Sequence, residues 1–346
     1  MADAKMELLY PHSPDVLERE YLDGGFSAGW CHHAKPVPKY FFDCHIHYNG
    51  GKEGSVIAKM EDAYNFASLC GTKKAMIMMQ TYGVKWNPNQ IENSIMDHFP
   101  YFSVEDLKNQ VKGFAKTEKY YLGIYLNYSS PEPQLVEDSV NMGARMFKLH
   151  NAPVIENNVH PGIWHSDEWA ETFKAIEKHN MALNFHVTQR LSPSAYTGGG
   201  RNTYWVKGWE SGCKYKNEDL LQSFLSCVDK YPGINFIGAH QLHIGWERLD
   251  KLFGEYNNLH IDSSVGCRLL LYDNFYEHDK RYLREMFIKN ADRILFGTDT
   301  LWGDGPLNHE NTMMIQDHMR YILALDLPQE ALDKICYKNS ERLFKV

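Results

Sequence analysis

Two histidines separated by a single residue, His45 and His47, close the segment Phe41-Phe42-Asp43-Cys44-His45-Ile46-His47. Successive side chains of a strand point to opposite faces, so both imidazoles would share one face with Asp43. Two neutral imidazoles on one face can bind one divalent metal ion. The pattern alone is a weak indication of a metal, because such a short motif also occurs by chance.

Further ionisable residues stand where other short apolar segments end: Lys148, His150, His186, His240 and Asp299. Each one alone has a simpler explanation, a polar side chain that faces a loop. Their coincidence favours a shared site, because the carboxyl ends of parallel strands meet at one face of a barrel. Imidazole and carboxylate groups suit Zn²⁺ and also Mn²⁺ or Fe²⁺. His150 stays open between a place in this cleft and a solvated loop.

These residues need buried strands that alternate with helices to bring them together. Apolar runs predict strands over Tyr40–Ile46, Lys74–Met79, Tyr121–Leu126, Arg145–Leu149, Ala182–Val187, Asn235–Ala239, Leu259–Ser263 and Arg293–Thr298. Apolar residues spaced three and four apart predict helices over Glu168–Lys178, Asn217–Asp229, Asp279–Ile288 and Asn311–Leu325. This alternation predicts an α/β fold, the closed (β/α)₈ or TIM barrel. The chain has no Gly-rich phosphate-binding motif, which disfavours nucleotide-binding folds.

Composition sets the class of protein. The 346 residues carry 36 Lys and Arg against 44 Asp and Glu, a net charge of −8, and 43% are hydrophobic. This balance predicts a globular chain that binds neither nucleic acid nor a membrane. The N-terminal residues lack the pattern of a secretory signal, and the seven cysteines form no C-x-x-C motif. We therefore expect a cytoplasmic protein with reduced thiols.

Two segments fall outside the repeating pattern. Residues 1–38 precede the first strand, and we expect an N-terminal arm that packs on the barrel of residues 39–346 or on a neighbouring subunit of a homo-oligomer. Residues 189–216 form a long loop after the fifth strand. We expect Arg201 and Trp205 of that loop, and Trp302 after the eighth strand, to bind a small-molecule substrate together with Lys148 and His150. The alternative for the long loop is a subunit contact.

The motifs together resemble the amidohydrolase superfamily, and most closely its amidohydrolase-related family. The matching pieces, in order over residues 39–346, are Asp43-Cys44-His45-Ile46-His47, Phe147-Lys148-Leu149-His150, His186, His240, Gly297-Thr298-Asp299 and Asn339-Ser340-Glu341-Arg342-Leu343-Phe344. The set is specific for the superfamily and not for one reaction.

The resemblance implies a site with one divalent ion, Zn²⁺ first and Mn²⁺ or Fe²⁺ as alternatives. His45, His47, His186 and Asp299 would hold it, and His240 and Asp299 would be the catalytic acid and base groups. Lys148 stands where relatives with two ions carry a carboxylated lysine, and we expect it unmodified. Asp43 would lie deeper and orient the histidines.

The expected activity is a metal-dependent hydrolase that opens a lactone or another cyclic ester or amide of a small organic or sugar acid, with metal-bound water as the nucleophile. The alternative is a metal-dependent non-oxidative decarboxylase of a small carboxylic acid with the same ligands. A barrel that keeps its metal but only binds a partner is the third possibility.

Overall fold

A computed structural model describes residues 36–81, 100–126, 130–151, 159–188, 215–264 and 277–346. Its strands form one sheet in the order β8-β7-β6-β5-β4-β3-β2-β1-β9, and the neighbouring strands pair in parallel. The strands are β1 Phe41–Tyr48, β2 Thr72–Gln80, β3 Tyr120–Tyr125, β4 Ala144–His150, β5 Ala182–His186, β6 Asn235–Gly238, β7 Leu259–Asp262, β8 Ile294–Leu295 and β9 Thr300–Trp302.

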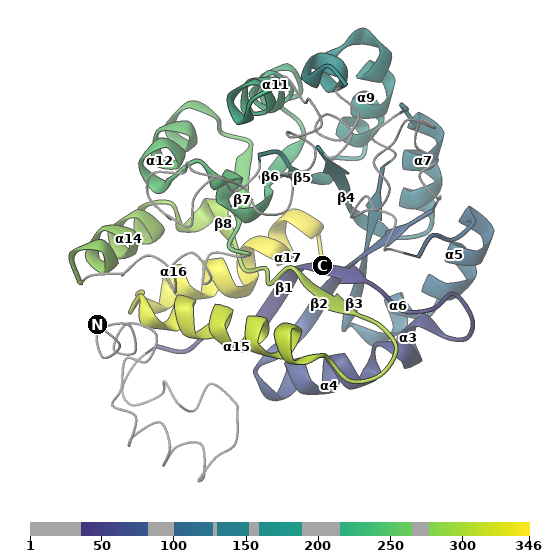
Figure 1. The fold of residues 1–346 in the computed structure, drawn as a ribbon, viewed down its shortest axis with the longest axis horizontal. Coiled ribbons are helices and arrows are strands. Elements are labelled where there is room, and N and C mark those ends of the chain that lie inside the picture. Colours follow the sequence, from purple (N-terminus) through teal and green to yellow (C-terminus); the bar gives the residue numbers. More distant parts are fainter. Residues whose placement is uncertain (1–35, 82–99, 127–129, 152–158, 189–214, 265–276) are drawn as a thin grey trace.

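The sheet closes on itself through a single stretch of chain, residues 294–302. Its first part, β8, pairs with β7, and its last part, β9, pairs with β1. Figure 1 shows the strands near the centre with helices around them. The predicted α/β barrel of the TIM type is therefore confirmed.

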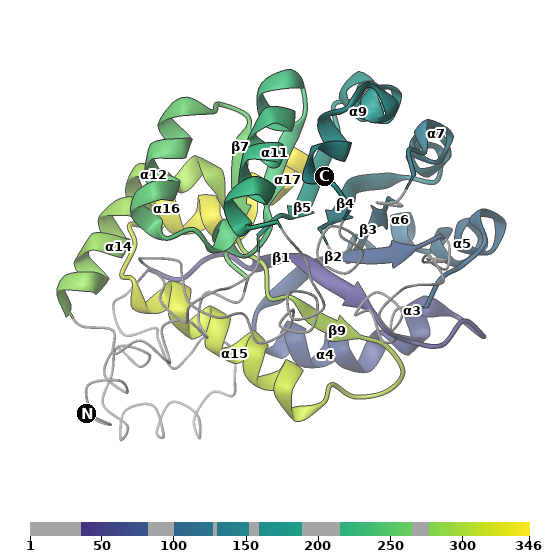
Figure 2. The ribbon, with the colours of Figure 1, turned by 45° about the horizontal axis from the view of Figure 1, so that its top comes forward.

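The helices form the outer layer of the barrel (Figure 2). They are α3 Val56–Lys59, α4 Glu61–Leu69, α5 Val104–Val111, α6 Phe114–Thr117, α7 Pro133–Asn141, α9 Ala170–Lys178, α11 Asn217–Lys230, α12 Trp246–Glu255, α14 Glu277–Lys289, α15 His309–Ala324, α16 Gln329–Asp333 and α17 Asn339–Phe344. Short 3-10 segments cover Pro161–His165, Asp167–Trp169, Ala239–His243 and Ala291–Arg293, and Lys334–Lys338 is a π-helical turn.

The core lies between the strands and the helices. Phe185 of β5 packs edge-on against Phe224 of α11, with ring centroids 5.6 Å apart, and Phe236 of β6 packs against the same ring at 5.7 Å. Each is buried, and full burial of one such side chain contributes about 1.5–3 kcal/mol. These contacts hold the strands at the centre and fix which side chains face inward.

The predicted strand over Arg293–Thr298 is the one that the structure corrects. Ladder pairing stops at Leu295 and resumes at Thr300, and Asp299 between them has a left-handed backbone with φ 62°. A non-glycine residue rarely adopts this conformation. The apolar residues of this segment therefore do not predict the break in the strand. The other predicted strands and helices agree with the structure to within about two residues, the usual scatter at element ends.

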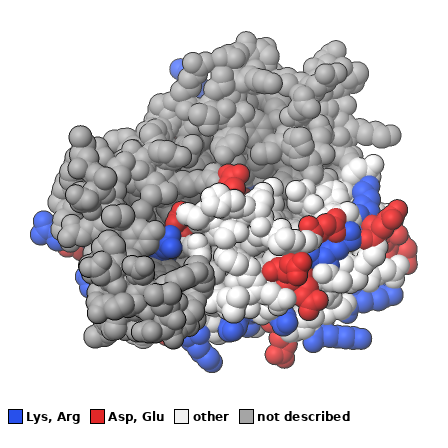
Figure 3. All heavy atoms as spheres, turned by 60° about the horizontal axis from the view of Figure 1, so that its bottom comes forward, with Lys and Arg blue, Asp and Glu red and all other residues white. Residues whose placement is uncertain are grey.

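In Figure 3, charged side chains of both signs lie mainly at the right and lower edges of the described part of the face, and its middle is mostly uncharged. The four cysteines in the described ranges, Cys44, Cys70, Cys227 and Cys336, are buried free thiols. Among the described residues, the helices are too short or too polar to cross a bilayer.

Candidate metal centre

The strand register brings the predicted polar residues to one side of the sheet, at the carboxyl ends of the strands. Lys148 on β4 pairs with Asn184 on β5, and His150 pairs with His186. Paired residues on neighbouring strands point to the same face. Lys148 reaches His45 of β1 across the barrel, with 3.3 Å between its Nζ and the imidazole Nε2. The shared face is therefore the interior of the barrel.

Three candidate ligand atoms converge at the end of β1. The His45 Nε2 and His47 Nε2 atoms are 3.2 Å apart. The Oδ1 atom of Asp299 lies 3.3 Å from the first and 2.9 Å from the second. Ligand atoms around a tetrahedral Zn²⁺ at about 2.0–2.1 Å would be about 3.3 Å apart. The donor types and spacing therefore fit one divalent ion.

Asp299 owes its place to the break in the eighth strand. Its backbone N–H donates to the carbonyl oxygen of His45 at 2.8 Å, and its side chain keeps 26% of its area exposed. Burial raises the pKa of Asp299, but the neighbouring imidazoles of His45, His240 and His47 outweigh it and hold that pKa well below its usual range. The carboxylate is thus ionised and ready to bind a cation.

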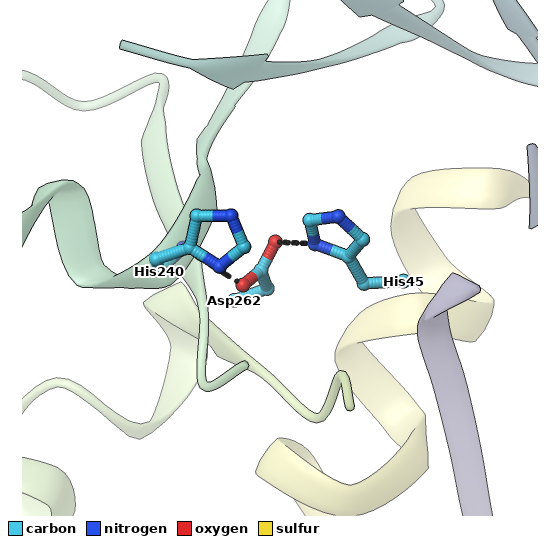
Figure 4. A group of neighbouring side chains, drawn as sticks. All are labelled: His45, His240 and Asp262. Atoms are coloured by element: carbon cyan, nitrogen blue, oxygen red, sulfur yellow. Dashed lines mark hydrogen bonds and ion pairs between the residues drawn. The ribbon is translucent and has the colours of Figure 1, made fainter. Parts of the chain in front are cut away.

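His45 is oriented from its other ring nitrogen by Asp262 of β7. The distance from His45 Nδ1 to Asp262 Oδ2 is 2.8 Å, and Asp262 lies between His45 and His240 in Figure 4. A carboxylate only accepts, so His45 carries its proton on Nδ1 and its lone pair on Nε2. The orientation is the one that a metal ligand needs.

A second group of possible ligands, His45, His240 and Asp262, is better explained as a hydrogen-bond network. Oδ2 of Asp262 accepts from His45 and from the Asn184 amide at 2.8 Å. Its Oδ1 accepts from the backbone N–H groups of His240 at 3.0 Å and Ser264 at 3.1 Å, and from the Ser264 hydroxyl. These donors occupy the lone pairs that a cation would need.

His47 is oriented by a different kind of partner. The hydroxyl of Tyr125, at the end of β3, lies 2.6 Å from His47 Nδ1. Burial lowers the pKa of His47 to about 4, so the ring is neutral and can offer a lone pair. Tyr125 therefore contacts the Nδ1 atom of His47 in the same way that Asp262 contacts the Nδ1 atom of His45.

His240 lies just outside the ligand group. Its Nε2 is 4.0 Å from Asp299 Oδ2, and its ring stacks on His45 with centroids 5.0 Å apart. Burial lowers the pKa of His240 to about 3, so its ring is neutral. A neutral imidazole at this place can take a proton from a group bound next to Asp299.

His186 and His150 form the wall beside His240. The His186 ring lies 4.7 Å from that of His240 and 4.2 Å from that of His150. His186 is outside the three-atom ligand group, and its buried Nε2 has no hydrogen-bond partner among the described residues. Such a nitrogen is costly unless something binds it, and a metal ion would satisfy it. His150 is buried beside His186 and does not lie in solvent, since it is 5% exposed.

Lys148 lies beneath the ligand group and is 1% exposed. Its Nζ donates to Asn184 Oδ1 at 2.6 Å, and burial lowers its pKa to about 8. Asp43 does not orient an imidazole as expected, because Asp262 and the Tyr125 hydroxyl contact the Nδ1 atoms of His45 and His47. It accepts from the backbone N–H groups of His45 at 3.1 Å and Thr298 at 3.0 Å, which joins β1 to the segment that carries Asp299.

Trp302 does not reach this centre. The expected loop position is wrong, because Trp302 belongs to β9, is 0% exposed and donates its indole N–H to Thr300 Oγ1 at 3.1 Å. Its ring packs against Tyr64 of α4, in the outer layer. Arg201 and Trp205 lie outside the described residues, as do most of the predicted arm and loop.

The sequence does not single out Tyr125 or Asp262 as the residue that orients a ligand histidine. Asp262-Ser263-Ser264 fits the start of a helix as well as it fits a site. Tyr125 is one of many strand tyrosines, and only its register marks it: it pairs with the inward-facing Lys148. Alternation along β3 does not say which of its residues face the interior, so the sequence alone holds no signal for Tyr125.

Comparisons with known proteins give a family match and several structural ones. The model of a family described as amidohydrolase matches residues 127–346. The curated proteins include no sequence match to the chain.

Three similar solved structures share the barrel. Dihydroorotase from Campylobacter jejuni is 15% identical with a TM-score of 0.54, over 90% of this chain and 85% of that one. 2,6-Dihydroxybenzoate decarboxylase from Rhizobium is 14% identical with a TM-score of 0.54, over 89% and 98%. A probable 2-pyrone-4,6-dicarboxylic acid hydrolase from Acinetobacter baumannii, with citric acid bound, is 11% identical with a TM-score of 0.53, over 88% and 99%. At these identities the likeness shows the fold alone.

Proposed function

Because the chain belongs to the amidohydrolase family, whose model matches more than half of it, we propose that it is a divalent-metal-dependent hydrolase. Its substrate would be a lactone or another cyclic ester or amide of a small organic or sugar acid. The observation that carries the proposal is the convergence of His45 Nε2, His47 Nε2 and Asp299 Oδ1 within 3.3 Å, with the neutral His240 beside them.

His45, His47 and Asp299 would hold the ion, and the unpartnered Nε2 of His186 would complete the set. When bound, a divalent ion supplies Lewis acidity and lowers the pKa of a coordinated water to about 7. Zn²⁺ is the first choice for a site of imidazole and carboxylate, with Mn²⁺ and Fe²⁺ as alternatives.

Two residues of the chain would move the proton. His240 Nε2 faces Asp299 Oδ2 at 4.0 Å, which leaves room for a water to bridge them. Asp299 orients the attacking water, and His240 takes its proton as the new C–O bond forms. The same imidazole then donates that proton to the ring oxygen or nitrogen when its bond to the carbonyl carbon breaks.

The remaining predicted contacts concern the substrate. Lys148 and His150 border the interior on the β4 side, and we propose that they contact polar groups of a bound acid. Arg201 and Trp205 would close over it, the guanidinium on a carboxylate and the indole on an apolar part. Both are proposed on the length and composition of their loop.

Decarboxylation is the second candidate, because the solved structures that share this barrel include a decarboxylase as well as hydrolases. The same ligands could bind a substrate carboxylate, and His240 could then protonate the carbon that loses CO₂.

Product analysis in H₂¹⁸O separates the two reactions. The full chain, loaded with Zn²⁺, Mn²⁺ or Fe²⁺, is mixed with a panel of lactones, cyclic amides and aromatic carboxylic acids. Hydrolysis predicts one ¹⁸O atom in each new carboxylate and no CO₂. The control is the His45→Ala, His47→Ala double variant.

Release of CO₂ without ¹⁸O uptake would overturn the hydrolase proposal in favour of decarboxylation. Activity that the double variant retains would overturn the proposed ligands.

A further inference from the structure

Asp262 has a wider reach than the orientation of one histidine. Its buried carboxylate accepts from His45 on one side and, through Oδ1, from the segment that carries His240 on the other. The Asn184 amide donates to its Oδ2 at 2.8 Å, and the backbone N–H groups of His240 and Ser264 donate to its Oδ1 at 3.0 and 3.1 Å, so both oxygens act as acceptors. Asp262 is therefore a fixed acceptor at the centre of the network.

Ser264 stands between Asp262 and His240. Its hydroxyl donates to Asp262 Oδ1, and its Oγ lies 2.7 Å from His240 Nδ1. A longer contact of 3.3 Å leads to His45 Nδ1, whose proton already goes to Asp262 at 2.8 Å. The Ser264 hydroxyl is thus placed against two imidazoles and one carboxylate, all buried.

Counting protons settles the direction of these bonds. A hydroxyl has one proton, and Asp262 Oδ1 acts as an acceptor toward the backbone N–H groups beside it, so the Ser264 proton goes to this oxygen. The bond between Ser264 and His240 then requires the imidazole to donate from Nδ1. In its neutral form His240 must carry its lone pair on Nε2, the atom that faces Asp299.

The backbone around His240 is built to hold this arrangement. His240, Gln241, Leu242 and His243 all have positive φ, between 50° and 57°, a left-handed turn that costs about 1–2 kcal/mol per residue. The Gln241 amide holds the turn by donating to the carbonyl oxygens of Asp262 at 3.0 Å and Ser264 at 2.8 Å. The strained turn is thus bonded to the same segment that carries Ser264, so the two keep their relative position.

We propose that Ser264 is a positioning residue that fixes the tautomer of His240. Because its own proton goes to Asp262, its oxygen accepts from His240 Nδ1, and the lone pair of that ring is left on Nε2. The expected effect on turnover rests on the proposed function, in which His240 acts as a base through the Nε2 atom that faces Asp299. The tautomer of His240 follows from the hydrogen bonds and does not depend on that function.

The test reads the tautomer directly. Histidine-labelled ¹⁵N protein of the full chain, loaded with Zn²⁺, is examined by long-range ¹H–¹⁵N correlation, with His240 assigned through His240→Asn. We expect a protonated Nδ1 and an unprotonated Nε2 in the natural chain. Ser264→Ala should shift His240 toward the other tautomer, and Ser264→Thr, which keeps the hydroxyl, should restore the original pattern.

Ser263→Ala is the matched control. Ser263 is equally buried, but its hydroxyl accepts from Gly297 at 3.4 Å instead of contacting His240. This variant should leave the His240 signals unchanged.

Activity provides the second readout. With a substrate found in the product panel, Ser264→Ala should lower kcat about 10–100-fold with little change in KM and the same metal content. An unprotonated Nδ1 in the natural chain would overturn the proposal, and this result needs no variant, so it holds even if Ser264→Ala folds poorly. In a folded Ser264→Ala variant, an unchanged His240 tautomer would overturn the proposal as well. A shifted tautomer with unchanged kcat would leave the positioning intact and overturn the role of His240 as the base.

Discussion

Asp299 contacts His45 twice: its backbone N–H donates to the His45 carbonyl oxygen at 2.8 Å, and its carboxylate Oδ1 lies 3.3 Å from the imidazole Nε2 of the same residue. The two contacts are possible because Asp299 leaves the strand conformation with φ 62°. Gly297 permits the approach, since a Cβ there would lie 3.0 Å from that of His45. The geometry of the candidate metal centre is therefore built into the backbone.

Metal content should depend on the paired histidines. The natural chain is expected to bind close to one divalent ion, and the His45→Ala, His47→Ala double variant to bind none. The reason is the loss of two of the three converging atoms. Elemental analysis after dialysis measures this, with the exposed His309→Ala as control. Two tightly bound ions per chain would contradict the single-ion site.

His240→Asn should separate chemistry from metal binding. His240 Nε2 lies 4.0 Å from Asp299 and outside the converging group, so metal content should stay near that of the natural chain. Turnover should fall about 10²–10⁴-fold, the usual contribution of a general acid or base. The measurements are kcat on an identified substrate and elemental analysis. A variant that loses its metal would make His240 a ligand.

Asp262→Asn should destabilise the protein strongly. The side chain is 0% exposed, and an amide nitrogen at either oxygen would face donors such as His45 Nδ1. Removing one partner of such a buried network costs about 3–5 kcal/mol. Denaturant unfolding of the metal-free protein measures the loss. The exposed Asp304→Asn, which breaks a contact to Lys59, should have little effect. Equal losses in the two variants would refute the special place of Asp262.

Acid should destabilise the fold through His318 of α15. This fully buried imidazole lies 2.8 Å from the Ser263 carbonyl oxygen, and burial lowers its pKa to about 4. Its unfolded pKa is about 6.5. Between these values the unfolded chain binds more protons, so the contribution is complete above pH 6.5 and is lost as the pH falls toward 4.

The matched variant is His318→Gln, which keeps a donor but does not titrate. Between pH 7 and pH 4.5 the natural chain should lose about 2 kcal/mol more unfolding free energy than the variant. Denaturant unfolding at both pH values measures the difference. The two chains losing stability equally would show that another group is responsible.

The sequence was sufficient for the parts of the site that depend on alternation. His45 and His47 share a face because they are two apart on a strand, and Lys148 with His150 follow the same rule on β4. The order of strands and helices also predicted the barrel, since a parallel closed sheet is what such alternation builds.

The parts that it could not predict depend on a break in that rule. Because the ladder stops before Asp299, counting alternate residues from β8 cannot place Trp302, whose ring packs against Tyr64 of α4. The role of Asp262 depends on donors that come from β1, β5 and the turn after β6. Contacts between distant segments leave no local pattern.

The division of the eighth strand also has a consequence for motion. The barrel closes there through pieces of only two and three residues, β8 and β9. A closure with so few ladder bonds should open at a lower free energy than the rest of the sheet. An ion held by β1 on one side and Asp299 on the other would join the two edges and raise that opening energy by mass action. The exchange rate of the Asp299 amide hydrogen, which donates to the His45 carbonyl oxygen across this closure, should then be lower with the ion bound than without it.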